Sequence, residues 1–121
     1  MSEEPKTPRS EDAKTQLKNI AVFLDRDGTL NRDLGYTHLY ERWEWLPGAT
    51  MALKLLYLAG LKLVVVTNQA GIAKSLYKEE DVLLLHRKVD LELRESGTII
   101  AGWYFCPHHP QYTGECDCRK P

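Results

Sequence analysis

The chain has 121 residues, of which 43% are hydrophobic and 27% charged, so it can form one small globular domain. Its formal net charge of −1 provides no basic field for nucleic acid or for an anionic membrane. No apolar stretch approaches the ~20 residues that cross a bilayer, and the polar first residues lack a signal-peptide core, so we expect a cytoplasmic protein.

The first 16 residues contain Pro5, Pro8 and many charged side chains, which is typical of a flexible polar tail. A single domain is predicted over residues 17–121. Its first element is a buried strand, Ile20–Leu24, because five consecutive apolar residues suit a strand covered on both faces.

Two carboxylates, Asp25 and Asp27, follow this strand in a turn that contains Gly28. The carboxyl end of a strand is where open α/β sheets bind ligands. Two close acids repel each other unless a cation or a shared proton relieves them, so the pair indicates a magnesium site with one nucleophilic and one proton-transferring carboxylate. A solvated acidic turn is the alternative. A calcium loop is excluded, because Leu30 and Tyr36 stand where it needs Gly and Glu.

The following segment, residues 31–46, has no regular period but carries four large aromatic residues: Tyr36, Tyr40, Trp43 and Trp45. It is either a flap that covers a substrate or a loop that packs buried aromatic rings.

Two helix–strand units come next. A helix near Ala49–Ala59 ends before Gly60 and precedes a strand at Leu61–Val66. A second helix, Glu79–Glu95, has acids in its first turn and precedes a strand at Ile99–Phe105. Its predicted buried stripe is Val82, Leu85, Val89 and Leu93. This alternation predicts a parallel sheet with right-handed crossovers.

The residues after the second predicted strand are Thr67-Asn68-Gln69-Ala70-Gly71-Ile72. A hydroxyl, an amide and exposed backbone N–H groups at a strand end can bind an oxyanion. A threonine that simply caps the next helix is the alternative. Next to the acid pair on a neighbouring strand, the segment is predicted to hold a phosphate group.

All three cysteines lie near the end of the chain, in Cys106-Pro-His108 and Cys116-Asp-Cys118. Three thiolates and one imidazole are a tetrahedral zinc set, and four protein ligands leave no open position, so we expect a structural zinc ion. Free reduced thiols are the alternative. Arg119 and Lys120 follow the last cysteine, and are either aimed at the site by the zinc loop or an ordinary basic terminus.

Together these motifs resemble the haloacid dehalogenase superfamily of phosphotransferases with an aspartate nucleophile. The matching residues are Asp25-x-Asp27-Gly28-Thr29, Thr67-Asn68-Gln69 and Lys120, which correspond to three of the superfamily's four catalytic motifs. The zinc set is similar to that of the branch containing D,D-heptose 1,7-bisphosphate phosphatases and histidinol phosphatases. The heptose enzymes are favoured by Gly35-Tyr36-Thr37-His38, Trp45-Leu46-Pro47-Gly48 and Thr67-Asn68-Gln69-Ala70-Gly71-Ile72-Ala73-Lys74.

The resemblance implies an α/β fold with a Rossmann-like three-layer parallel sheet and a zinc-binding loop. It also implies a magnesium-dependent phosphatase that removes the 7-phosphate of D-glycero-D-manno-heptose 1,7-bisphosphate through an aspartyl-phosphate. Asp25 would be the nucleophile, and Asp27 would protonate the leaving oxygen and then activate water. Asp25 and the backbone carbonyl of Asp27 would hold magnesium.

The same resemblance implies that Thr67 and Asn68 bind the transferred phosphoryl group, and that Gln69 also belongs to the residues that bind the substrate phosphate. Lys120 would stabilise Asp25 and phosphate oxygens, and Arg119 would contact the retained phosphate. Lys74 stands where the family usually has arginine, so it can attract phosphate but lacks the bidentate guanidinium.

The superfamily's fourth motif, a Gly-Asp turn, is not in the sequence. We therefore expect a fold that is incomplete at its C-terminus, an apolar sheet edge at residues 20–24 and weak activity of this chain alone. The partner is predicted to be a small sugar phosphate, and the complete protein a monomer. Two other functions stay open: hydrolysis of histidinol phosphate, and a zinc-binding remnant without catalysis.

Overall fold

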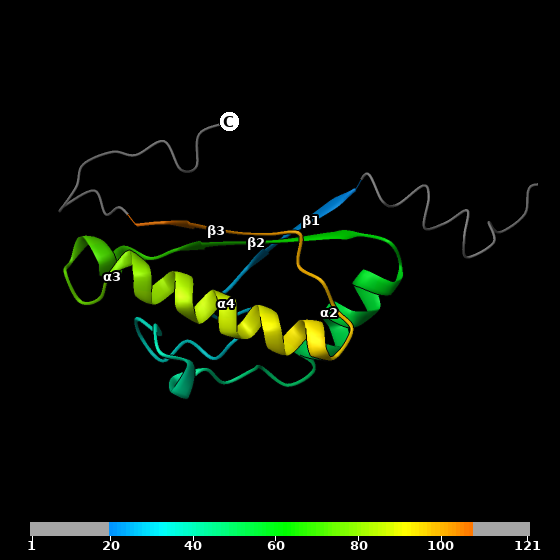
Figure 1. Ribbon diagram of the computed structural model, residues 1–121, viewed down its shortest axis with the longest axis horizontal. Helices are drawn as coiled ribbons and strands as arrows, with labels where there is room; N and C mark the ends of the chain where they lie inside the picture. The colour runs from blue at the N-terminus through cyan, green and yellow to red at the C-terminus, as the bar shows by residue number, and fades with distance from the viewer. Residues whose placement is uncertain (1–19, 108–121) are drawn as a thin grey trace, which may run out of the picture.

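Three parallel strands form the sheet of the computed structural model, which describes residues 20–107 (Figure 1). They are β1 (Ala21–Asp25), β2 (Lys62–Asn68) and β3 (Gly102–Cys106), in the spatial order β1-β2-β3. The register places Asp25 opposite Val66 and Asn68 opposite Cys106. The parallel α/β architecture predicted from the sequence is therefore confirmed.

The helices lie between the strands in the chain. They are η1 (Tyr40–Arg42), α2 (Ala49–Leu58), α3 (Ala70–Ala73) and α4 (Glu79–Glu95). Helix α4 has the predicted bounds, whereas β2 runs two residues further than predicted because Thr67 and Asn68 pair with β3. Within residues 20–107, no helix combines the length and the apolar character that a membrane span requires.

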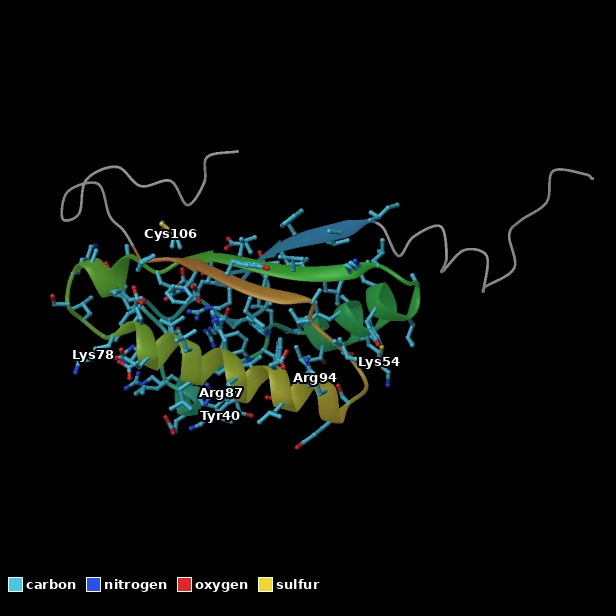
Figure 2. All side chains as sticks on the ribbon, turned by 45° about the horizontal axis from the view of Figure 1, so that its top comes forward. Tyr40, Lys54, Lys78, Arg87, Arg94 and Cys106 are labelled. Carbon is cyan, nitrogen blue, oxygen red and sulfur yellow. The ribbon has the colours of Figure 1, made fainter. Side chains whose placement is uncertain are left out.

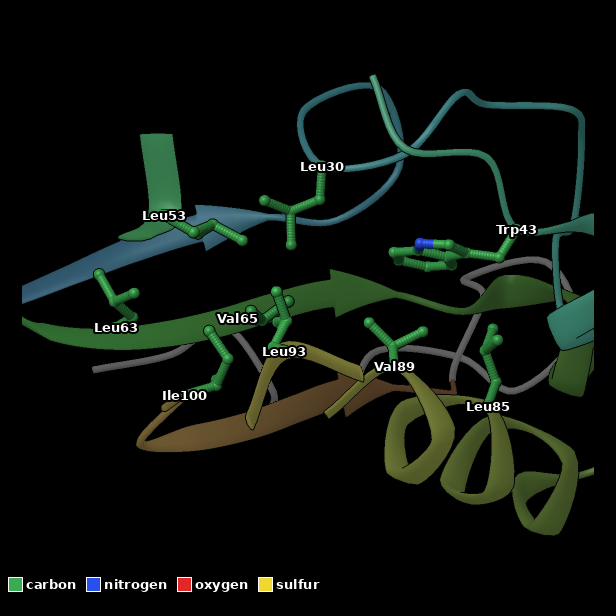
Figure 3. Close-up of a cluster of buried hydrophobic side chains, with 9 residues drawn as sticks. All are labelled: Leu30, Trp43, Leu53, Leu63, Val65, Leu85, Val89, Leu93 and Ile100. Carbon is green, nitrogen blue, oxygen red and sulfur yellow. The ribbon is translucent and has the colours of Figure 1, made fainter. Parts of the chain in front are cut away.

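The core lies on one face of the sheet, where α2 and α4 both pack (Figure 3). Leu63 and Val65 of β2 point to this face and are fully buried, because alternate residues of a strand face the same side. The predicted stripe of α4 is confirmed, with every member at most 1% exposed. The buried cluster consists of Leu30, Trp43, Leu53, Leu63, Val65, Leu85, Val89, Leu93 and Ile100.

The opposite face of the sheet is open in the part of the chain that the structure describes. Phe23 is 69% exposed and Tyr104 is 61% exposed. The prediction that β1 is buried on both faces is therefore wrong for residues 20–107, since its side chains alternate between exposed and half-buried. Residues 20–107 form two of the three predicted layers, namely the sheet and the helices on one of its faces. Strand β1 lies at one edge of this sheet, as predicted.

The aromatic loop over residues 31–46 partly packs and partly faces the solvent. Trp43 is buried in the core and meets Trp45 edge to face, with 5.2 Å between the ring centroids. Glu92 of α4 accepts hydrogen bonds from the Tyr40 hydroxyl and the Trp45 indole, both at 2.7 Å. Figure 2 shows Tyr40 beside α4. These contacts fix the second half of the loop on the helix, while Tyr36 remains 44% exposed.

Candidate active site

A cavity of about 340 Å³ lies where the carboxyl ends of β1 and β2 meet the aromatic loop. Five of the residues predicted for the site share this cavity: Asp25, Asp27, Thr67, Asn68 and Gln69. The other lining residues are Asp33, Gly35, Tyr36, Ala70 and Tyr77. Because parallel strands end at the same edge of a sheet, segments some 40 residues apart in sequence come together here.

Side-chain donors surround the Asp27 carboxylate. The Arg26 guanidinium donates to both of its oxygens, at 2.9 and 3.0 Å from Nη2 and 3.1 Å from Nε. The Asn31 amide donates to Oδ1 at 3.0 Å, and the Gln69 amide donates to Oδ2 at 3.1 Å. Thr67 Oγ1 lies 3.5 Å from the same oxygen. These contacts hold Asp27 in one orientation at the cavity wall.

Asp25 has a different environment. Its side chain is exposed, and its Oδ1 accepts a hydrogen bond at 2.9 Å from the backbone N–H of Arg26. It also borders a second cavity, of about 140 Å³, that Asn68 and Cys106 help to line. Both carboxylates line the cavity, but Asp25 is the more exposed of the two.

A chain of hydrogen bonds fixes Gln69. Burial raises the pKa of Tyr77 to about 12, so its hydroxyl keeps its proton and donates to Gln69 Oε1 at 2.5 Å. The amide nitrogen of Gln69 is thereby turned toward Asp27 and Thr67, to which it donates at 3.1 and 2.9 Å. A Cβ on Gly71 would lie 2.1 Å from the Tyr77 ring, so this close approach requires glycine.

The first half of the aromatic loop meets the segment after β2 across the cavity. The His38 imidazole stacks on the Tyr77 ring, with 4.4 Å between the centroids. Lys74 Nζ donates to the Tyr36 hydroxyl at 2.6 Å. Lys74 therefore lies at the rim, in contact with a residue that lines the cavity. Tyr36 follows Gly35 in the left-handed region, at φ 51°, and this bend turns the chain toward the cavity.

Arg26 and His86 were not identified from the sequence as parts of the site. Arg26 is fully buried, and its guanidinium lies 3.2 Å from His86 Nε2 and 5.7 Å from the centre of the Trp43 ring. It also donates to the backbone carbonyl of Thr37 at 2.7 Å. The sequence did indicate that His86 is buried, because it lies four residues after Val82 and therefore on the apolar face of α4.

The buried histidine predicts a pH-dependent stability. Burial and then the Arg26 guanidinium lower the pKa of His86 to about 3, whereas an unfolded imidazole titrates near 6.5. Between these values the unfolded state binds the extra proton, so the free energy of unfolding decreases as the pH falls. We expect His86 to account for a loss of roughly 2 kcal/mol from pH 7 to pH 5.

Urea unfolding of the wild type and of His86→Gln at both pH values measures this contribution. The variant should lose less stability than the wild type over the same interval, because it has no titrating group at this position. Equal losses in the two proteins would show that His86 does not cause the dependence.

The remaining predicted ligands, His108, Cys116, Cys118, Arg119 and Lys120, lie outside the described residues. Cys106 is described; it is buried at the end of β3 (Figure 2).

No group of three or more His, Cys, Asp or Glu side chains suited to a metal ion occurs among residues 20–107. Magnesium does not require such a group, because it is bound by one or two carboxylates together with water and substrate phosphate. The exposed Asp25 carboxylate, which lines the cavity, is a ligand of this kind.

Comparison with known proteins finds similarity to phosphatases. No protein-family model matches the chain. It is 46% identical over 105 residues to D-glycero-β-D-manno-heptose-1,7-bisphosphate 7-phosphatase of Pasteurella multocida. It is 44% identical over 106 residues to the enzyme of that name from Escherichia coli K12. These matches include 84% of this chain but 57% and 56% of the relatives, so the chain spans little more than half of their length.

Solved structures agree with the sequence matches. D,D-heptose 1,7-bisphosphate phosphatase of B. bronchiseptica, solved with magnesium and phosphate, superimposes with a TM-score of 0.75 at 33% identity. A protein of Mesorhizobium loti described as a HAD-like phosphatase gives a TM-score of 0.74. The alignments cover 84% of this chain and 56% and 51% of those proteins.

Proposed function

We propose that this chain, which belongs to the haloacid dehalogenase superfamily, carries the active site of a magnesium-dependent phosphatase. The proposed reaction removes the 7-phosphate of D-glycero-β-D-manno-heptose 1,7-bisphosphate. The observation that carries the proposal is the meeting of Asp25, Asp27 and Thr67 at one cavity, together with relatives named for this reaction. A cytoplasmic location and a single domain over residues 17–121 after a polar tail belong to the same proposal.

In the first step, an oxygen of the Asp25 carboxylate attacks phosphorus, and the bond between phosphorus and the sugar oxygen breaks. In the complex with substrate, Asp27 is protonated, and it gives this proton to the departing oxygen, which leaves as an alcohol. The exposed position of Asp25 suits a nucleophile, because the substrate arrives from the solvent.

In the second step, Asp27 takes a proton from a water molecule whose oxygen attacks the phosphoryl group on Asp25. The bond between phosphorus and Asp25 breaks, and inorganic phosphate leaves. The same residue thus serves as acid and then as base, so both carboxylates return to their starting forms.

Four other residues are proposed to serve the phosphate-binding part of the site. Thr67 and Asn68 line the cavity beside Asp25 and offer a hydroxyl and an amide to the phosphoryl oxygens. Gln69 contributes by holding Thr67 in place, because its side-chain N–H groups already donate to Thr67 and Asp27. Lys74, at the rim, can attract phosphate. Arg119 and Lys120 are proposed to contribute the further positive charge that the resemblance implies.

Magnesium is the proposed cofactor. Asp25 and the backbone carbonyl of Asp27 would hold it, and when bound it neutralises negative charge on the phosphoryl oxygens. The solved relative that contains magnesium and phosphate supports this assignment.

Phosphate release tests the substrate. The chain, purified without chelator, is mixed with magnesium and either D-glycero-β-D-manno-heptose 1,7-bisphosphate or histidinol phosphate. We expect release from the heptose bisphosphate to be the faster, and weak in absolute terms for this chain alone. Faster release from histidinol phosphate would overturn the assignment of the substrate.

We also propose a structural zinc ion bound by Cys106, His108, Cys116 and Cys118. Metal analysis of this chain should find about one zinc ion per chain, because three thiolates and an imidazole complete a tetrahedral shell. The double substitution Cys116→Ser and Cys118→Ser should remove the ion. Protein without zinc and with three titratable thiols would rule out the site.

A further inference from the structure

Arg26 stands between the two acids in the sequence, but its side chain contacts only one of them. Within residues 20–107, the Asp27 carboxylate is the one acid within ion-pair distance of the guanidinium, at 2.9 Å. Arg26 is 0% exposed and the Asp27 side chain is 22% exposed. The charge of Asp27 is therefore compensated by a cation that the solvent does not reach.

The other described groups that contact the guanidinium are neutral. They are the carbonyl of Thr37, the ring of Trp43 and the imidazole of His86. Because the pKa of His86 lies near 3, its ring carries no charge at neutral pH and accepts the hydrogen bond of Arg26. These contacts orient the guanidinium toward Asp27 and leave its charge for that carboxylate.

Among residues 20–107, no cation forms an ion pair with Asp25. It is exposed, and the hydrogen bond that it accepts from the Arg26 backbone is a contact with a neutral group. Two carboxylates that are close in sequence thus present different charges to the cavity. In the described part of the chain, one is paired with a buried cation and the other is not.

We propose that Arg26 is a positioning residue that gives the two carboxylates their separate roles. By pairing with Asp27, it keeps that side chain away from the cation and leaves Asp25 as the carboxylate that binds it. The inference rests on the proposed function, because it concerns the same magnesium site. The pairing also holds Asp27 at the orientation from which a proton can be transferred.

A comparison of four proteins tests this assignment through magnesium affinity, measured by titration calorimetry without substrate. They are the wild type, Asp27→Asn, Arg26→Gln and the double variant. A unit charge several ångströms from a bound cation changes its affinity by roughly fivefold. Asp27→Asn should therefore bind magnesium about fivefold more weakly, because the Arg26 charge is then unpaired, and Arg26→Gln about fivefold more tightly.

The double variant is the decisive protein, because its two amide side chains together carry no net charge, as the native ion pair does. We expect it to recover the wild-type affinity. If the Asp27 side chain were itself a ligand, the double variant would still bind magnesium more weakly than the wild type, and the inference would be overturned. If Arg26→Gln alone fails to fold, the double variant still tests the proposed role of Arg26.

Asp25→Asn separates this inference from the proposed function. If the wild type does not bind magnesium, or if Asp25→Asn binds it equally well, the proposed metal site is wrong and the role of Arg26 is wrong with it. If Asp25→Asn loses magnesium but the double variant does not recover it, only the role of Arg26 is wrong.

Discussion

Asp25→Asn should reduce phosphate release from the heptose bisphosphate by at least ~10³-fold. The amide keeps the size of the side chain but cannot attack phosphorus, and it is a poorer ligand for magnesium. Because the Asp25 side chain is exposed and is not part of the core, the stability of the fold should change little. The measurement is initial-rate phosphate release, with circular dichroism as the check on folding.

Glu80→Gln is the matched control for this experiment. It makes the same change from carboxylate to amide at an exposed position in the first turn of α4, away from the cavity. Its rate should equal that of the wild type. A folded Asp25→Asn variant that retains a tenth or more of the activity would show that another group attacks phosphorus.

Asp27→Asn should slow hydrolysis by about 10²- to 10⁴-fold, and the loss should depend on the leaving group. A sugar oxygen departs poorly without a proton, so the heptose bisphosphate should show the full loss. p-Nitrophenolate departs without a proton, so formation of the aspartyl-phosphate from p-nitrophenyl phosphate should be slowed much less. The measurement is the release of nitrophenol in the first turnover, compared with release of phosphate from the sugar.

This pattern separates a proton-transferring residue from one that only supports the site. Damage to phosphate or magnesium binding would slow both substrates by the same factor. Equal losses would therefore contradict the role of Asp27, even if the variant were strongly impaired. Asn31→Ala, which removes one donor to Asp27, should give a smaller loss with the same dependence on the leaving group.

The sequence identified the residues of the site that come from strand ends. Asp25 and Thr67 follow apolar runs, and parallel strands bring such positions to one edge, so their meeting could be predicted. The environment that distinguishes Asp27 from Asp25 could not. It depends on Arg26, Asn31 and other side chains whose orientation is set by packing, and the spacing of residues along the chain does not encode that orientation.

In the fold, too, some features could be predicted from the sequence pattern and others depend on packing. Helix α4 was predicted at its observed bounds, because its acidic first turn, its apolar stripe and Gly97 agree on the same limits. The burial of β1 was predicted wrongly from its apolar composition, since composition does not tell whether a neighbouring layer is present. Likewise, Thr67 and Asn68 look like turn residues in the sequence and pair in β2 because β3 lies beside them.

The most direct test of the site is thermal unfolding with magnesium and beryllofluoride, a phosphoryl analogue that binds an aspartate nucleophile without turnover. At 100 times its dissociation constant, such a ligand stabilises the fold by about 2.7 kcal/mol, which raises the Tm by roughly 10 °C or more in a domain of this size. We expect this rise in the wild type and none in Asp25→Asn. A wild type that does not respond, or an equal rise in both proteins, would contradict the assignment of Asp25 as the group that receives the phosphoryl.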